Sequence, residues 1–137
     1  NTLKLFSVMD DFFKTYYVPA ETFIAHTTDG FCSITLNDVD YLEAQNKWVL
    51  VYLSDGKVQK LREQFSKCEG IFTPEKGFFK CHRSYIVNLS RIRQFTRTQI
   101  TTAFSSSVPI SRNSYAAFKD AYFAFMFDSG TNFTTLD

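Results

Sequence analysis

The sequence lacks any long apolar segment. No stretch approaches the roughly 20 consecutive apolar residues that span a bilayer. The first residues, Asn1 to Lys4, lack the long apolar run and the small-residue cleavage site of a signal peptide. With 45% apolar and 21% charged residues among 137, the chain fits one domain of about 100–200 residues with a packed core, which excludes collagen, coiled coil and low-complexity sequence. We therefore expect a soluble, cytoplasmic domain that does not contact a membrane.

Residues that carry catalysis or bind metals are scarce. The three cysteines are 36 and 13 positions apart, which fits neither a disulfide framework nor a zinc-binding pair and favours a reducing compartment. Cys81 and His82 are adjacent, so on an extended strand they would point to opposite faces, and no nearby acid is available to orient the imidazole. The five single glycines form no phosphate-binding loop. We therefore expect no enzymatic activity, no metal and no cofactor.

Acidic residues are absent from residues 76–119, the most basic part of the chain. This segment has a net charge of +8, while residues 1–75 and 120–137 have net charges of −4 and −3. Its bases are Lys76, Lys80, Arg83, Arg91, Arg93, Arg97, Arg112 and Lys119. Such a segment favours binding of a polyanion, in particular nucleic acid. The alternative is a solvated face whose balancing acids lie across a sheet.

The aromatic content of 18% favours β structure. Short alternating apolar segments, bounded by turn residues, predict strands. They cover residues 23–26, 31–36, 39–43, 48–53, 58–64, 78–88, 92–95 and 99–104. The first two are expected to form a hairpin. Strands of this length and spacing predict a mainly β, antiparallel domain with helices at its edges.

Helical spacing of apolar residues predicts three helices. The first covers residues 3–17. A capping box at Ser66 and Glu69 indicates a short second helix after Gln64, and Ser111 is a candidate N-cap of the last helix. The expected buried face of the last helix consists of Tyr115, Phe118, Tyr122 and Phe125. A polar tail follows from Asp128.

Two arginines flanked by polar residues stand at the ends of apolar segments. The two strings are His82-Arg83-Ser84, before residues 85–87, and Ser111-Arg112-Asn113, after residues 108–110. A guanidinium can bind guanine O6 and N7 together, and Ser, Asn and His side chains donate to phosphates. The strings therefore predict two loops that contact DNA. Alternatively, either arginine binds a carboxylate from the acidic first half of the chain.

Four blocks of sequence occur in an order that resembles one bacterial family. They are Ile34-x-Leu-x-Asp38-Val-x-Tyr41-Leu-Glu43-Ala44, Asp55-Gly56, Phe79-Lys-Cys-His82-Arg83-Ser84-Tyr85-Ile86-Val87-Asn88-Leu, and Val108-Pro109-Ile110-Ser111-Arg112. From about residue 22 to residue 124 the chain resembles the LytTR DNA-binding domain, which is found at the C-terminus of bacterial response regulators.

The resemblance implies an elongated, mainly β fold of antiparallel sheets with short peripheral helices. It also implies that loops of the domain enter successive major grooves of a direct-repeat promoter site. Bases would be read from the loop Gln45-Asn46-Lys47, from Arg83 and from Arg112. Phosphates would be contacted by Lys80, His82, Ser84 and Ser111. Because Lys47 stands where the family has asparagine, the resemblance favours a backbone contact by the first loop.

The sequence therefore predicts a sequence-specific, duplex-DNA-binding domain of a bacterial transcription regulator over residues 22–127. A helix and linker over residues 1–21 precede it, and a tail over residues 128–137 follows. The expected partner is promoter DNA, and a homodimer or an upstream sensor or receiver domain of a two-component system remains open. Two alternative functions also remain open. One is a protein-interaction or sensory module of the same fold, and the other is a single-stranded nucleic-acid binder that stacks bases on its aromatics.

Overall fold

Short strands and two α-helices make up the part of the chain that the structure describes. A computed structural model gives residues 21–103 and 106–128. The strands are β1 (Thr22–His26), β2 (Phe31–Thr35), β3 (Val39–Gln45), β4 (Trp48–Leu53), β5 (Val58–Leu61), β6 (Phe78–His82), β7 (Tyr85–Asn88), β8 (Ile92–Phe95), β9 (Gln99–Thr102) and β10 (Ser107–Pro109). The helices are α2 (Phe65–Ile71) and α3 (Tyr115–Asp128), and the 3-10 turns are η1 (Leu36–Asp38), η2 (Pro74–Lys76), η3 (Leu89–Arg91) and η4 (Arg112–Ser114). The helix predicted over residues 3–17 and the tail after Asp128 lie outside the described residues.

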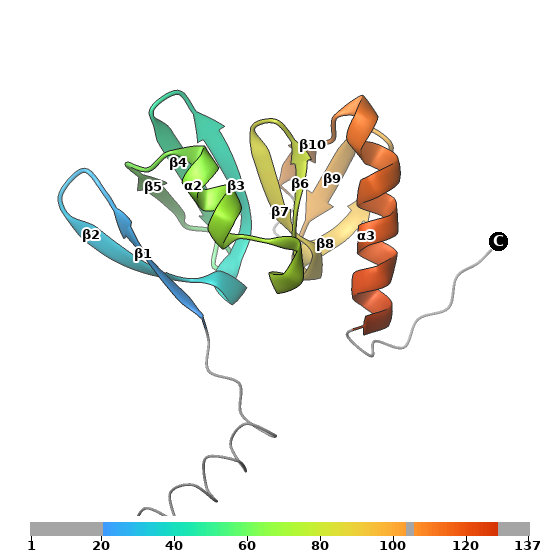
Figure 1. The fold of residues 1–137 in the computed structure, drawn as a ribbon, viewed down its shortest axis with the longest axis horizontal. Coiled ribbons are helices and arrows are strands. Elements are labelled where there is room, and N and C mark those ends of the chain that lie inside the picture. Colours follow the sequence, from blue (N-terminus) through green and yellow to red (C-terminus); the bar gives the residue numbers. More distant parts are fainter. Residues whose placement is uncertain (1–20, 104–105, 129–137) are drawn as a thin grey trace, which may run out of the picture.

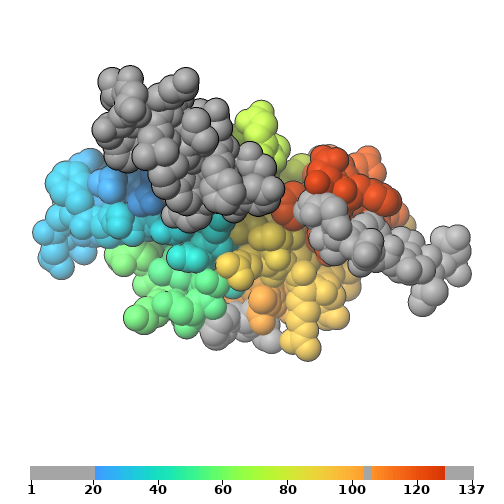
Figure 2. Space-filling view, turned by 90° about the horizontal axis from the view of Figure 1, so that it is seen from below, coloured from blue at the N-terminus to red at the C-terminus, as the bar shows by residue number. Residues whose placement is uncertain are grey.

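Three antiparallel sheets follow one another along the long axis of the molecule (Figure 1). The central sheet has the strand order β5-β4-β3-β7-β6. The β1–β2 hairpin lies on one side of it, and the three-stranded sheet β10-β9-β8 lies on the other. The hairpin, coloured blue, and α3, coloured red, mark the two ends in Figure 2. The predicted elongated, mainly β fold is therefore confirmed.

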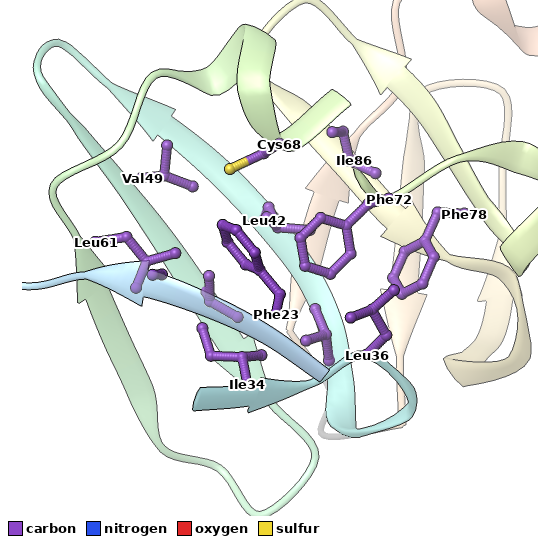
Figure 3. Packing of buried hydrophobic residues seen from close by; sticks show 13 residues of the cluster. Phe23, Ile34, Leu36, Leu42, Val49, Leu61, Cys68, Phe72, Phe78 and Ile86 are labelled. Atoms are coloured by element: carbon purple, nitrogen blue, oxygen red, sulfur yellow. The ribbon is translucent and has the colours of Figure 1, made fainter. Parts of the chain in front are cut away.

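A separate hydrophobic core covers each face of the central sheet. Successive side chains of a strand point to opposite faces, so on β3 Leu42 belongs to the first core and Tyr41 to the second. The first core joins the central sheet to the β1–β2 hairpin and α2, with Phe72 packed edge-on against Phe23 (Figure 3). The second core joins the sheet to β8–β10 and to Phe118 of α3. The central sheet is therefore held rigidly from both sides.

Most predicted strands agree closely with the structure. Strands β4 and β8 have the predicted bounds, and β1 and β2 form the predicted hairpin. The segment 78–88 instead divides into β6 and β7, which pair antiparallel across a turn at Arg83 and Ser84. This turn sets the geometry of the first predicted DNA-contacting string.

Neither Ser66 nor Ser111 makes a side-chain capping hydrogen bond of the predicted kind, although Ser111 does occupy the N-cap position of η4, which leads into α3. Helix α2 begins at Phe65 with Gln64 as its N-cap, so Ser66 lies inside the helix. Packing decides this start, because Phe65 and Cys68 both contact the first core. Ser111 precedes η4, and its side chain makes no capping hydrogen bond. Its backbone is fixed by β6 instead, as described below.

The predicted apolar stripe of α3 is confirmed. Phe118 is fully buried, and Tyr115, Tyr122 and Phe125 pack against the second core while partly buried. The Phe125 ring also lies over Gly77, which ends η2 with a φ of +90°. A Cβ at position 77 would lie 3.0 Å from the Phe125 ring. Glycine is therefore required here both by the backbone conformation and by the close approach of α3.

Replacing Gly77 with alanine is expected to destabilise the domain by about 1–2 kcal/mol, because alanine is strained at positive φ and its methyl group would displace Phe125. Gly70→Ala is the matched control, since Gly70 lies in α2 and a Cβ there meets no atom within 4 Å. The control is expected to stabilise by about 0.5–1 kcal/mol. Urea unfolding of both variants measures the difference. Equal unfolding free energies for the two variants would contradict the proposed role of Gly77.

Polar side chains tie β3 to the segment after β7. Asn88 is buried, and its side-chain NH2 donates to the Val39 carbonyl over 2.8 Å. Arg91 donates to the Asn37 carbonyl over 2.7 Å, and its Nε lies 3.9 Å from the buried Asp40 carboxylate. Burial raises the pKa of Asp40, and Arg91 offsets this only in part. Asn88 and Arg91 therefore hold the fold together at a distance from the predicted DNA-contacting strings.

Candidate nucleic-acid interface

Two hairpin turns and the segment that leads into α3 lie along the same edge of the molecule. Strand β3 pairs antiparallel with both β4 and β7, and β7 pairs antiparallel with β6. The β3–β4 turn and the β6–β7 turn therefore emerge at one end of the central sheet, along the upper edge of Figure 1. The start of α3 reaches the same edge. We call residues 45–47, 82–84 and 111–113 together the turn edge.

Backbone hydrogen bonds hold the three parts of the turn edge side by side. The Ala44 N–H donates to the Ser84 carbonyl over 2.8 Å, which joins the first turn to the second. The Ser111 N–H donates to the Cys81 carbonyl over 2.9 Å, which joins the second turn to the segment before η4. The two polar strings are thus brought together although they are far apart in the sequence.

Arg83 and Arg112 both lie on the turn edge with exposed side chains. Arg83 occupies the β6–β7 turn, and Arg112 is the first residue of η4. Within residues 21–103 and 106–128, neither guanidinium has an ion pair or hydrogen-bond partner. The alternative in which either arginine binds a carboxylate is not observed in this part of the chain. No described residue therefore occupies the hydrogen-bond donors of either guanidinium.

The His82 ring is held in one orientation. Its Nδ1 accepts a hydrogen bond from the Ser84 N–H over 3.1 Å, and its ring packs edge-on against Tyr85 at a centroid distance of 5.5 Å. A histidine that accepts at Nδ1 keeps its proton on Nε2 when it is neutral. His82 therefore presents a single N–H donor beside Arg83.

The β3–β4 turn is a tight two-residue hairpin turn. Gln45 pairs with Trp48, and Asn46 between them adopts a left-handed conformation with a φ of 49°. Asparagine tolerates this conformation better than most residues do. Asn46 and Lys47 are both exposed at the tip, and Lys47 forms no ion pair or hydrogen bond through its side chain with another described residue. The tip thus presents one amide and one unpaired cation.

Glu43 organises the base of this turn, a role that sequence reasoning missed although Glu43 belongs to a quoted motif. Its carboxylate accepts from Tyr52 Oη over 3.0 Å and from Gln45 Nε2 over 3.2 Å. Tyr52 stacks on Tyr41 at a centroid distance of 4.2 Å. Burial and the nearby Glu43 carboxylate raise the pKa of Tyr85 to about 12. Only the pairing of β3 with β4 and β7 brings these side chains together.

Several bases of segment 76–119 are balanced by acids from the first half of the chain. The pairs are Lys76–Glu21, Lys80–Glu69 and Arg91–Asp40. The Lys80 ammonium also lies over the Phe65 ring, 5.8 Å from its centroid. The reading of this segment as a face balanced by acids is thus correct for these three bases. Arg83 and Arg112 on the turn edge, in contrast, form no ion pair with any described residue.

Cys81 is not placed to act as a nucleophile. It is fully buried, and its thiol lies 3.5 Å from the Pro109 carbonyl. Burial raises the pKa of this thiol to about 12, so it stays protonated at neutral pH. All three cysteines have free thiols. In the described ranges, no three His, Cys, Asp or Glu residues gather as a metal site would require, and no helix has the length and hydropathy to cross a bilayer.

The LytTr DNA-binding domain family matches residues 29–122. Two similar curated proteins are both named transcriptional regulatory protein YpdB. The one from Escherichia coli O6:H1 is 36% identical, and the match covers 61% of this chain and 36% of that protein. The one from Escherichia coli K12 is 32% identical with the same coverage. The chain thus spans about a third of the length of these relatives.

A solved structure shares the fold. It is a LytTr DNA-binding domain from Bacillus cereus, which superposes with a TM-score of 0.60 and 26% sequence identity. The match covers 79% of this chain and all of that domain. Since the family also matches more than half of the sequence, the chain belongs to the LytTr DNA-binding domain family.

Proposed function

We propose that this chain is the sequence-specific, duplex-DNA-binding domain of a bacterial transcription regulator, and that Arg83 and Arg112 read bases. The observation that carries the proposal is the position of the two guanidinium groups. Both are exposed on one edge, have no partner among the described residues, and are held together by the bond between Ser111 and Cys81. A guanidinium with this freedom can bind guanine O6 and N7 in a major groove.

The smaller polar groups of the turn edge are suited to phosphate contacts. His82 offers one N–H, and Ser84, Ser111 and Asn113 offer short side chains beside the arginines. Such contacts fix the orientation of a protein on DNA without reading its sequence. Lys47 at the tip of the first turn would contact backbone in the same way.

Selecting bound duplexes from a random pool tests this function with the whole chain. The expected result is an enriched direct repeat with a spacing of about one helical turn, roughly 10–10.5 base pairs. The repeat would arise because two copies of the domain bind the same face of the duplex. Enrichment of single strands, or recovery of unselected sequences, would contradict the proposal.

The position of the aromatic side chains favours duplex binding over base stacking. In the described part of the chain, the strongly exposed large hydrophobic residues are Ile24, Phe31, Val58 and Phe127. The other aromatics pack largely into the two cores, so few rings are free to stack on unpaired bases. Direct competition between single-stranded and duplex forms of the selected site distinguishes the two modes.

Lys80→Ala is expected to weaken binding to all duplex sequences by a similar factor. Because Glu69 already partners Lys80, the salt-dependence slope should fall by less than the roughly one unit expected for a free cation. Glu69→Gln is the matched comparison and should raise affinity for all sequences, since it releases the ammonium. Titrations at several salt concentrations measure both effects. A loss confined to one sequence would show that Lys80 reads a base instead.

A further inference from the structure

A hollow of about 900 Å³ lies beside the β3–β4 turn. Its walls are the β1–β2 turn, the tip of the β3–β4 turn, residues 62–64 after β5, and Lys67 of α2. Its volume is at the upper end of the roughly 300–1,000 Å³ of typical ligand sites. Asn46 and Lys47 line the hollow and also belong to the turn edge, so the hollow adjoins the turn edge at these two residues.

The wall of the hollow is held by hydrogen bonds between β1 and the segment after β5. The Arg62 N–H donates to the His26 carbonyl over 2.8 Å. The His26 N–H donates to Glu63 Oε2 over 2.9 Å, and His26 Nδ1 lies 3.2 Å from the same oxygen. These contacts fix the backbone of Arg62 while leaving its side chain exposed.

Among the described residues that line the hollow, Glu63 is the one carboxylate, and it is already paired. The Glu63 side chain is only 6% exposed, and Lys67 Nζ lies 3.3 Å from its Oε1. Burial acts to raise the pKa of Glu63, but the hydrogen bonds from His26 and Lys67 outweigh it, so the pKa is lowered. Glu63 is therefore charged at neutral pH and paired within the wall. The positive charge of Arg62 and Lys47 has no such partner among the described residues.

We propose that this hollow binds a backbone phosphate of the same DNA duplex, next to the bases that face the β3–β4 turn. The inference rests on the proposed function, because the sugar-phosphate backbone of the DNA can reach the hollow only if the turn edge faces a groove of the duplex. Arg62 and Lys47 bind the phosphate, and a guanidinium suits this because it donates two parallel hydrogen bonds. The Phe31 ring is exposed, and its centroid lies 4.5 Å from that of the His26 ring. It offers an apolar surface to the deoxyribose next to the bound phosphate.

Methylphosphonate scanning of the selected duplex tests this site with the whole chain. Each duplex carries one uncharged methylphosphonate in place of one phosphate. For wild-type protein, a methylphosphonate at one position in the DNA, beside the bases that face the β3–β4 turn, is expected to lower the affinity about two- to fivefold. This is the size of effect expected when one exposed ion pair is removed. Arg62→Ala should show a similar loss on unmodified DNA, a salt slope smaller by about one, and no further loss at that methylphosphonate. Arg62→Lys should recover most of the affinity.

Lys57→Ala is the matched control. It removes one exposed positive charge from the β4–β5 turn, at the end of β4 away from the turn edge, where the Lys57 side chain has no partner among the described residues. Lys57→Ala should lower the affinity only by the small amount expected for losing one distant positive charge. It should leave the methylphosphonate profile unchanged. If Arg62→Ala keeps the wild-type profile, or if Lys57→Ala alters it equally, the hollow does not bind phosphate although the proposed function stands. If wild-type protein shows no salt-dependent binding to any duplex, both are wrong.

Discussion

Replacing Arg83 or Arg112 with alanine is expected to cost about 1–3 kcal/mol of discrimination at one base pair for each arginine. The physical reason is the loss of two parallel hydrogen bonds to one guanine. Affinity for scrambled duplexes should fall much less, because there only one of several charge contacts is lost. Binding to the selected site and to its single-base variants, measured at fixed salt, gives the discrimination directly.

Lysine substitutions separate hydrogen-bond geometry from charge. Arg83→Lys and Arg112→Lys keep the positive charge but lose the planar fork. They should lose discrimination almost as alanine does, while keeping the wild-type salt slope. Lys57→Ala, at the other end of the central sheet, should lower the affinity slightly and equally for all sequences. Wild-type discrimination in both lysine variants would mean that the arginines contact phosphates rather than bases.

The two arginines should act on different base pairs and therefore contribute additively. They are held on neighbouring turns by the hydrogen bond from Ser111 to Cys81, and neither contacts a shared side chain in the described structure. Independent contacts usually add to within about 0.5 kcal/mol. The double alanine variant should lose discrimination at two positions, each as strongly as in the single variants. A loss at one shared position would show that both guanidinium groups bind the same base pair.

Local patterns were sufficient to predict most strands. The apolar run of residues 48–53 and the turn residues that bound it gave β4 its observed bounds, because both signals depend on residues close in sequence. The division of residues 78–88 was not predicted, since Arg83-Ser84 contains neither glycine nor proline to mark a turn. The short helix predicted after Gln64 was found as α2, but the Ser66–Glu69 capping box does not form its start, because Phe65 already packs against the first core.

Contacts across the sheets were beyond a reading of the sequence. The pairing of Lys80 with Glu69 of α2, and of Arg91 with Asp40 of β3, depends on which elements pack together in space. A one-residue change of strand register would also exchange the faces of a strand. The same limit applies to the hollow, because Arg62 meets Lys47 only through the arrangement of three turns. For the same reason, the absence of acids from residues 76–119 could not show that Lys76, Lys80 and Arg91 are paired with acids from the first half of the chain.

The largest expected effect on stability belongs to Phe118. Its side chain is completely buried in the second core and packs edge-on against Phe79 and Phe95, with centroid distances of 5.8 and 5.0 Å. Phe118→Ala is expected to destabilise the domain by about 3–5 kcal/mol, because it removes buried apolar surface and leaves a cavity. Lys119→Ala is the matched control on the exposed side of α3 and should change stability by no more than about 0.5 kcal/mol. Guanidinium unfolding measures both.

The same substitution tests how α3 positions the turn edge. Helix α3 follows η4 without a break, so Arg112 is held from one side by Phe118 and from the other by the bond of Ser111 to Cys81. Arg83 lies on the β6–β7 hairpin, which touches Phe118 through Phe79 but is also anchored in the first core by Phe78 and Ile86. Under conditions where Phe118→Ala remains folded, discrimination at the Arg112 base pair should therefore weaken more than discrimination at the Arg83 base pair. Equal weakening at both positions would mean that the two cores act as one cooperative unit, and unchanged discrimination at both would mean that β6 alone positions Arg112.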